Sequence, residues 1–453
     1  MPKECVFADT MRLLRDPAFA DTAREAIRDY VSWREVAGRP LPEGLAPEEY
    51  WQLLTTVRRL GATTFPIPAT TGDTFWYTLT IDGRRCLRAI ERHCRSDARL
   101  HQMVRHRTGQ RFLVASHIRE SIATCKNDGV EADTAELARM LSEGRTPRTP
   151  EGRLVRNTYE MLGELESLVG EDFSPELVGH LHERVIHGVD PGSLKRSGSR
   201  LRAVPSIFRE IVKDHLPPGI ESARSRPPDV AEDVLRQICD YANGTTGDPR
   251  EPVAVKGYMV LASMGYWHPL PDFNATVARH MLRLLSVKSD FPVLGYLPTS
   301  VMLRRWSKGT LDPGTVRYET IEPGIPVEDG LDGTAEILVH LQLTAAAVNE
   351  LRALIRSTKE EDEALGTTLR DAERFNYRQR DVLKQALRRP DTEFTLREHR
   401  LKHRTVYSTA RADLIELAES GLLEKHVRGQ AFVFTPAPDL RERLSHAGED
   451  DRE

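Results

Sequence analysis

The residues best suited to chemistry lie in one short stretch that contains His268, Asp272 and Asn274. Apolar segments precede and follow it, so we expect a loop that opens onto the N-terminus of a helix over residues 277–285. Unpaired backbone N–H groups and the helix dipole favour anions at such a place. A carboxylate suits Mg²⁺, an amide hydrogen-bonds phosphate oxygens, and a histidine accepts a proton from an attacking hydroxyl. The pattern indicates a phosphate site; the alternative is a helix-capping loop with a buried histidine.

The same stretch resembles the Fic motif, which runs His-Pro-Phe-x-Asp-Gly-Asn-Gly-Arg-x-x-Arg. The positions that match in register are His268, Pro269, Asp272, Asn274 and Arg279. Residues 252–258 are similar in placement to the helix that enters the motif, and the resemblance extends over about residues 106–354. It implies a mainly α fold, namely a Fido-type helical bundle with a β-hairpin flap.

The resemblance also implies roles for single residues. His268 would be the catalytic base that deprotonates a Ser, Thr or Tyr hydroxyl of a target protein, and Asp272 would hold Mg²⁺. ATP would be bound by Asn274, Ala275, Thr276 and Arg279. The flap that docks the target backbone is similar to the extended segment 200–208, with the docking residues Arg202, Val204 and Ile207. The alternative for that segment is a surface ribbon.

This chain departs from the motif at three positions. Phe273 and Ala275 stand where the family has glycines, which allow positive φ and a close approach of backbone to phosphate. Thr276 stands where the family has an arginine that neutralises the outer phosphates. Loss of one such charge in a shielded site costs about 10²- to 10³-fold in rate. We therefore weigh a catalytic domain equally against a nucleotide-binding or wholly degenerate one.

A second resemblance concerns inhibition. Many Fic proteins carry an inhibitory helix with the pattern Ser/Thr-x-x-x-Glu-Gly/Asn, and residues 121–129 are similar to it. Asp128 occupies the glutamate position, and Arg279 is retained as its implied partner. The alternative is that Asp128 and Gly129 only end a helix.

The sequence of the C-terminal module predicts three helices followed by a β-hairpin. Helices are expected at residues 378–388, 395–402 and from 408 to Gly421, and strands at 424–426 and 431–434. Residues 378–411 hold ten Lys or Arg against four acids, which is a local cationic footprint. The module resembles the winged helix-turn-helix domain appended to many Fic proteins. DNA is the preferred partner, contacted by Tyr407, Ser408, Thr409 and Arg411; the alternative is a protein–protein or homodimer interface.

Composition limits the remaining choices. A chain of 453 residues predicts several domains. Its net charge of −4 argues against a partner, such as bulk nucleic acid or an anionic membrane, that would bind the whole chain by charge. The five scattered cysteines form no CxxC pair, and no apolar run approaches about 18 residues. We expect a cytoplasmic protein without a membrane partner. The expected segments are a helical N-terminal region (1–105), a Fido domain (106–358), a charged linker helix (359–374), a winged helix (375–438) and a polar tail (439–453).

Two classes of function follow. The first is a protein adenylyltransferase, or AMPylator, which moves AMP from ATP to a target hydroxyl with Mg²⁺ and is inhibited through Asp128. The second is a degenerate Fido nucleotide-binding regulator of transcription that acts through its winged helix. His268, Asp272 and Asn274 favour the first, whereas the changes at 273, 275 and 276 favour the second. Transfer of phosphate or another phosphate-linked group is a third option.

Overall fold

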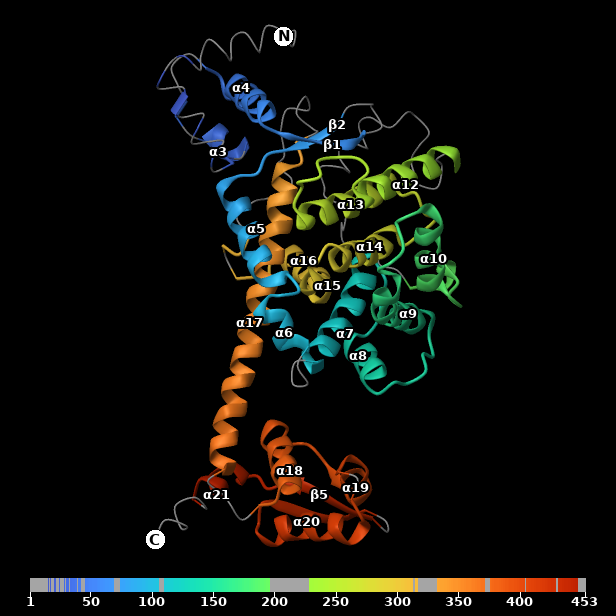
Figure 1. The fold of residues 1–453 in the computed structure, drawn as a ribbon, viewed down its shortest axis with the longest axis vertical. Helices are drawn as coiled ribbons and strands as arrows, with labels where there is room; N and C mark the ends of the chain where they lie inside the picture. Colours follow the sequence, from blue (N-terminus) through green and yellow to red (C-terminus); the bar gives the residue numbers. More distant parts are fainter. Residues whose placement is uncertain are drawn as a thin grey trace. The chain divides into compact units, whose positions relative to one another are not determined.

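The chain forms two compact units, Met1–Arg352 and Ala353–Glu453, in the computed structural model (Figure 1). The predicted mainly α fold is confirmed, with small antiparallel sheets as the only strands among the described residues. The long helix α17 (Thr334–Arg370) runs across the division, so residues 359–370 continue a helix that begins in the first unit. The structure describes residues 15, 17, 20–21, 24, 28, 30–31, 33–38, 40–41, 45–68, 74–105, 110–195, 228–312, 314–316, 332–370, 375–403, 405–428 and 431–446.

The first unit begins with α3 (Trp33–Gly38) and α4 (Pro47–Leu60), which pack through a small apolar cluster. An antiparallel hairpin of β1 (Thr63–Pro68) and β2 (Thr74–Tyr77) follows. Residues 63–73 are rich in proline, threonine and glycine, a composition that favours a break between helices, yet residues 63–68 form a regular strand. Phe65 and Ile67 alternate into the interior there, and prolines are tolerated because the sheet has two strands and hence no central one.

Helices make up the rest of this unit. They are α5 (Ile81–Cys94), α6 (Arg99–Arg105), α7 (Gln110–Asn127), α8 (Thr134–Ser142), α9 (Pro150–Glu164), α10 (Pro175–Ile186), α12 (Pro228–Asn243), α13 (Val253–Trp267), α14 (Asn274–Lys288), α15 (Pro292–Tyr296) and α16 (Thr299–Ser307), with 3₁₀ turns at Leu165–Leu168 and Pro191–Ser193. Several start where a side-chain oxygen accepts a backbone N–H, as Thr149 does for α9 and Ser174 for α10. Proline in the first turn fits both helices because that turn needs no N–H donor.

Helices α13 and α14 form the centre of this unit. Nearly every residue of α13 is buried, as expected for a helix that is apolar on all sides. α14 packs along α13 and lies between it and helices α7, α9 and α10 (Figure 1). α14 is also buried on most of its surface, yet it carries the charged residues Arg279 and Arg283 inside. The loop of the predicted motif therefore joins two helices that the surrounding fold holds rigidly.

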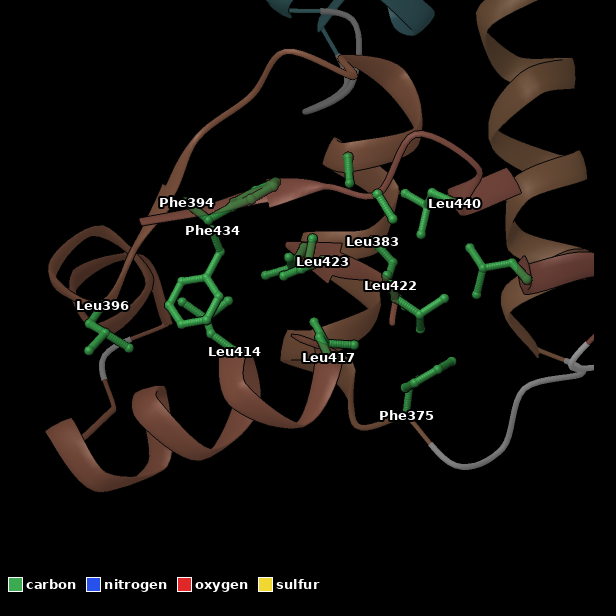
Figure 2. Close-up of a cluster of buried hydrophobic side chains, with 14 residues drawn as sticks. Phe375, Leu383, Phe394, Leu396, Leu414, Leu417, Leu422, Leu423, Phe434 and Leu440 are labelled. Atoms are coloured by element: carbon green, nitrogen blue, oxygen red, sulfur yellow. The ribbon is translucent and has the colours of Figure 1, made fainter. Parts of the chain in front are cut away.

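The second unit contains α18 (Tyr377–Arg388), β3 (Phe394–Thr395), α19 (Leu396–His403), α20 (Tyr407–Glu419), β4 (Leu423–Arg428), β5 (Ala431–Pro436) and α21 (Leu440–His446). The strands form one antiparallel sheet in the order β3-β5-β4. Side chains from these four helices and the sheet, among them Leu383, Leu414 and Phe434, meet in a single apolar core (Figure 2). The three helices α18, α19 and α20 and the hairpin of β4 and β5 follow the order that the sequence predicted, with the short strand β3 and the helix α21 in addition.

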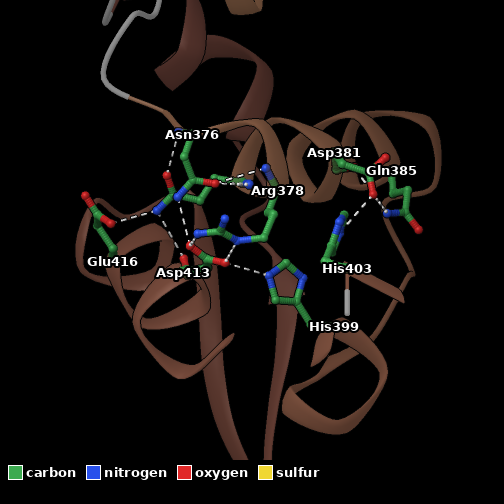
Figure 3. A network of polar contacts seen from close by, with 9 residues as sticks. Asn376, Arg378, Asp381, Gln385, His399, His403, Asp413 and Glu416 are labelled. Carbon is green, nitrogen blue, oxygen red and sulfur yellow. Dashed lines mark hydrogen bonds and ion pairs between the residues drawn. The ribbon is translucent and has the colours of Figure 1, made fainter. Parts of the chain in front are cut away.

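A polar network fixes α18 against α20 within the second unit (Figure 3). The buried carboxylate of Asp413 accepts hydrogen bonds from Asn376, Arg378 and His399 at 2.6–3.0 Å. Asn376 also caps the start of α18 by accepting the N–H groups of Arg378 and Gln379. Arg378 thus belongs to the interior network, although the sequence analysis counted it in the cationic footprint.

Each described helix is too short or too polar to cross a membrane.

Candidate active site

The loop between α13 and α14 turns sharply at both of its ends. His268 ends α13 in the left-handed region (φ 46°, ψ 55°), and its N–H donates to the carbonyl of Met264 at 3.1 Å. Phe273 precedes α14 in the same region (φ 55°, ψ 26°). Two non-glycine residues with positive φ within six positions are rare, and such conformations cluster at functional sites. The side chain of His268 is half-buried, so the fold leaves its imidazole within reach of solvent.

Phe273 adopts the conformation for which the motif uses glycine. Its ring is only 3% exposed, so burial of the ring offsets the backbone strain of a left-handed residue, which costs about 1–2 kcal/mol. The departure from the motif at this position is therefore compatible with a left-handed backbone.

We expect Phe273→Gly to be more stable than Phe273→Ala by about 1 kcal/mol, because glycine alone relieves the left-handed strain. Both variants lose the buried ring and should unfold more easily than the wild type. Chemical denaturation of the full chain measures the difference. Equal stabilities of the two variants would show that the backbone at this position carries no strain.

The N-terminus of α14 has no side-chain cap. The first hydrogen bond within the helix runs from the N–H of Val277 to the carbonyl of Phe273 at 2.9 Å. The backbone N–H groups of residues 274–276 therefore have no acceptor within the helix. Asn274 closes the loop instead: its amide accepts the N–H of Leu270 and donates to the carbonyl of Leu270, both at 2.8 Å. The helix also begins three residues earlier than the sequence predicted, because residues 274–276 form its buried first turn.

Asp128 meets the first turns of α14 from the end of α7. The hydroxyl of Thr276 donates to Oδ2 of Asp128 at 2.5 Å, and Nη1 of Arg279 lies 3.5 Å from Oδ1. All three side chains are largely buried, with Asp128 10% exposed and Arg279 4%. The structure therefore brings Asp128 to Arg279, as the inhibitory resemblance implied, and adds a hydrogen bond from Thr276. Asp128 also directly follows the last residue of α7, so the helix-ending alternative describes its backbone correctly.

Arg279 and Arg283 lie one turn apart on α14 but differ in their partners. Arg283 forms an ion pair with the buried Glu120 at 2.7 Å and donates to the carbonyl of Gly295 at 3.1 Å. The nearest carboxylate oxygen to Arg279, Oδ1 of Asp128, is farther away, at 3.5 Å. Nη1 and Nη2 of Arg279 have no hydrogen-bond partner among the described residues. His280 between them adds no charge, because burial, reinforced by Arg283 and Arg279, lowers its pKa to about 3. Arg279 therefore keeps donors available for an anion.

His182 of α10 is a residue of this loop region that the sequence analysis missed. It is 9% exposed and lies close to Asp272, and its Nε2 has no hydrogen-bond partner among the described residues. Burial lowers the pKa of His182 despite the nearby carboxylate of Asp272, which favours a neutral ring. No local pattern in the sequence links the two residues, because α10 and the loop meet only through the tertiary fold.

Asp272 is the residue predicted to bind Mg²⁺. Its Oδ1 accepts the N–H of Phe273 at 2.9 Å, and the residue is half-buried on the loop. The described residues contain no cluster of three or more His, Cys, Asp or Glu side chains that could hold a metal ion. A single hard carboxylate still fits, because Mg²⁺ that arrives with a nucleotide is held by one or two carboxylates together with phosphate oxygens.

The other predicted site residues fall outside this cluster. The docking residues Arg202, Val204 and Ile207 lie outside the described residues. In the second unit, Tyr407, Ser408 and Arg411 are exposed and Thr409 is half-buried in the first turns of α20. A polar pocket of about 420 Å³ between α5, α16 and α17 contains none of the motif residues.

Comparison with known proteins gives one kind of match. No family model matches the chain, and no curated protein matches its sequence. A solved structure described as the crystal structure of a Fic family protein from Desulfovibrio desulfuricans G20 aligns with 80% of this chain and 98% of that one. The sequence identity is 18% and the TM-score is 0.45. The chain is similar in structure to this Fic family protein.

Proposed function

We propose that the chain is a Fic-type protein that binds ATP at the start of α14 and transfers AMP to a hydroxyl of a target protein. The observation that carries the proposal is the buried guanidinium of Arg279, whose Nη donors have no hydrogen-bond partner among the described residues. A buried cation with unused donors is stabilised by an anion, and it lies beside a helix N-terminus that has no side-chain cap. His268 and Asp272 belong to the same loop, so the base and the metal ligand are positioned with the phosphate site.

The reaction uses the residues in the following order. The triphosphate lies against the first turn of α14 and Arg279, where backbone N–H groups and the guanidinium offset its charge. His268 takes the proton of the target hydroxyl as its oxygen attacks the α-phosphorus. A P–O bond forms to the target, the bond between the α-phosphorus and its bridging oxygen breaks, and pyrophosphate leaves. The products are the AMP ester, pyrophosphate and a proton held on the imidazole.

Asp272 is the residue that would hold Mg²⁺, which supplies charge neutralisation at the phosphates. His182, which lies close to Asp272, would help to orient this loop. Thr276 cannot replace the first arginine of the motif, because a hydroxyl carries no charge. We therefore expect slow transfer that depends strongly on Arg279.

The position of the label in ATP tests the reaction class. The purified full chain, and its Asp128→Ala variant, would be incubated with Mg²⁺, lysate proteins and ATP labelled at either the α- or the γ-phosphate. Covalent label from the α-position alone supports AMP transfer. Label from the γ-position indicates phosphate transfer instead, and no label from either position in both chains contradicts the proposed enzyme.

A regulator that acts through DNA is the second candidate. It is favoured by the exposure of Tyr407, Ser408 and Arg411 at the start of α20, where a recognition helix reads base edges and phosphates. The loss of Arg378 to the Asp413 network weakens the cationic footprint that supported this candidate. Gel retardation with random-sequence DNA, compared with an Arg411→Ala chain, tests it: retardation that needs Arg411 supports DNA binding, and no retardation favours a protein or homodimer interface.

The cytoplasm is the proposed location. The support is that the described cysteines, Cys86, Cys94, Cys125 and Cys239, are free thiols, as is usual in a reducing compartment. The target protein would then be a cytoplasmic one with an accessible hydroxyl.

A further inference from the structure

The backbone of Asp128 is fixed by the end of α7. Its N–H donates to the carbonyl of Thr124 at 3.2 Å, and the N–H of Val130 donates to the carbonyl of Cys125 at 3.1 Å. Gly129 supplies the positive φ of 89° that this turn requires. The carboxylate of Asp128 is therefore held close to the first turns of α14 before any side-chain bond is counted.

Two groups on α14 then compete to hold that carboxylate. The Thr276 hydroxyl donates a hydrogen bond directly to the carboxylate, and a hydrogen bond to an ionised acceptor is stronger than one between neutral groups. The distance of 3.5 Å from Arg279 exceeds the usual length of a hydrogen bond and leaves an attraction between charges. The direct hydrogen bond to Asp128 thus comes from Thr276, whose side chain is fully buried.

We propose that Thr276 is a positioning residue that holds Asp128 against Arg279 and so weakens nucleotide binding until the carboxylate is displaced. The position that provides a phosphate-binding arginine in the motif would here provide the anchor of the inhibitory acid. A carboxylate beside Arg279 attracts the guanidinium and repels a triphosphate. The more firmly Thr276 holds this carboxylate in place, the lower the affinity for ATP should be. This inference rests on the proposed function, because it assumes that ATP binds at α14.

Isothermal titration of the full chain with Mg²⁺ and a non-hydrolysable ATP analogue tests the anchor. The variants are Thr276→Val, which removes the hydroxyl at nearly equal volume, Thr276→Ser, which keeps it, and Asp128→Ala, which removes the acid. A hydrogen bond to a charged group is worth about tenfold in binding, so Thr276→Val should bind about tenfold more tightly than the wild type. Thr276→Ser should bind like the wild type.

The double variant makes the inference specific. If Thr276 acts only through Asp128, adding Thr276→Val to Asp128→Ala should change the affinity no further. Unchanged or weaker binding by Thr276→Val, while Asp128→Ala binds more tightly, would overturn the anchor and leave the proposed function intact. Absence of binding in every chain, Asp128→Ala included, would overturn the proposed function and the anchor with it. Circular dichroism melts of each variant would establish that the affinities are those of folded protein.

Discussion

Replacement of His268 by alanine should lower the rate of AMP transfer by about 10²- to 10⁴-fold, the usual contribution of a general base. The imidazole is half-buried at the edge of the loop, and its position is set by the left-handed backbone that ends α13. ATP is bound mainly by α14 and Arg279 in this account, so its dissociation constant should change much less than the rate. Single-turnover kinetics with α-labelled ATP, paired with titration of the ATP analogue, separate the two effects.

His187→Ala is the matched control for this substitution. His187 is an exposed histidine at the end of α10, so its loss should leave both rate and affinity close to those of the wild type. An equal loss of rate in both variants, or a His268→Ala chain as active as the wild type, would remove His268 from the role of base.

Asp413→Ala should destabilise the second unit by about 3–5 kcal/mol, the cost of removing one partner from a buried ion pair. Asp413 is 3% exposed and holds Arg378 at 2.6 Å, together with Asn376 and His399 (Figure 3). Its loss would leave the donors of Arg378 without their acceptor between α18 and α20. Hydrogen exchange of residues 375–446 in the full chain, followed with increasing denaturant, measures the change.

Titration of the Asp413 carboxylate should make the stability of the second unit depend on pH. Burial opposes ionisation of Asp413, but hydrogen bonds from Arg378, His399 and Asn376 outweigh it and hold its pKa below the ordinary value. A lowered pKa in the folded state stabilises the unit above the unfolded pKa of about 3.9, and this stability is lost as the pH falls through the folded pKa. The wild type should therefore lose stability below about pH 4, and Asp413→Asn should lose less over the same range.

Glu419→Ala is the control for the Asp413 substitution. Glu419 is an exposed acid at the end of the same helix, and loss of such a residue changes stability by less than about 0.5 kcal/mol. If Asp413→Ala were no more destabilising than Glu419→Ala, the network would have no stabilising role.

Sequence patterns predicted the second unit and α13 well because local signals dominate there. Pro252 and a continuous apolar run define α13, and Gly421 with a φ of 72° ends the turn after α20. The hairpin of β1 and β2 was missed because its prolines and threonines favour loops in a local interpretation, whereas the buried Phe65 and Ile67 make it a strand.

The sequence proposed the candidate residues and the approach of Asp128 to Arg279, whereas the other contacts between these residues depend on the fold. The motif identified His268, Asp272 and Arg279, which follow one another in the sequence. The hydrogen bond between Thr276 and Asp128 joins residues 148 positions apart, and the contact of His182 with Asp272 is also formed by tertiary packing alone. The difference between Arg279 and Arg283 likewise depends on Glu120, which only the folded chain brings to α14.

The proposed function requires that the start of α14 binds a polyphosphate through Arg279. The most direct measurement is the affinity of the Asp128→Ala chain for the non-hydrolysable ATP analogue with Mg²⁺, compared with the same chain carrying Arg279→Gln. Loss of charge-assisted hydrogen bonds to phosphate should weaken binding by about 10- to 100-fold. Equal affinities of the two chains would contradict the claim, because the nucleotide would then bind elsewhere.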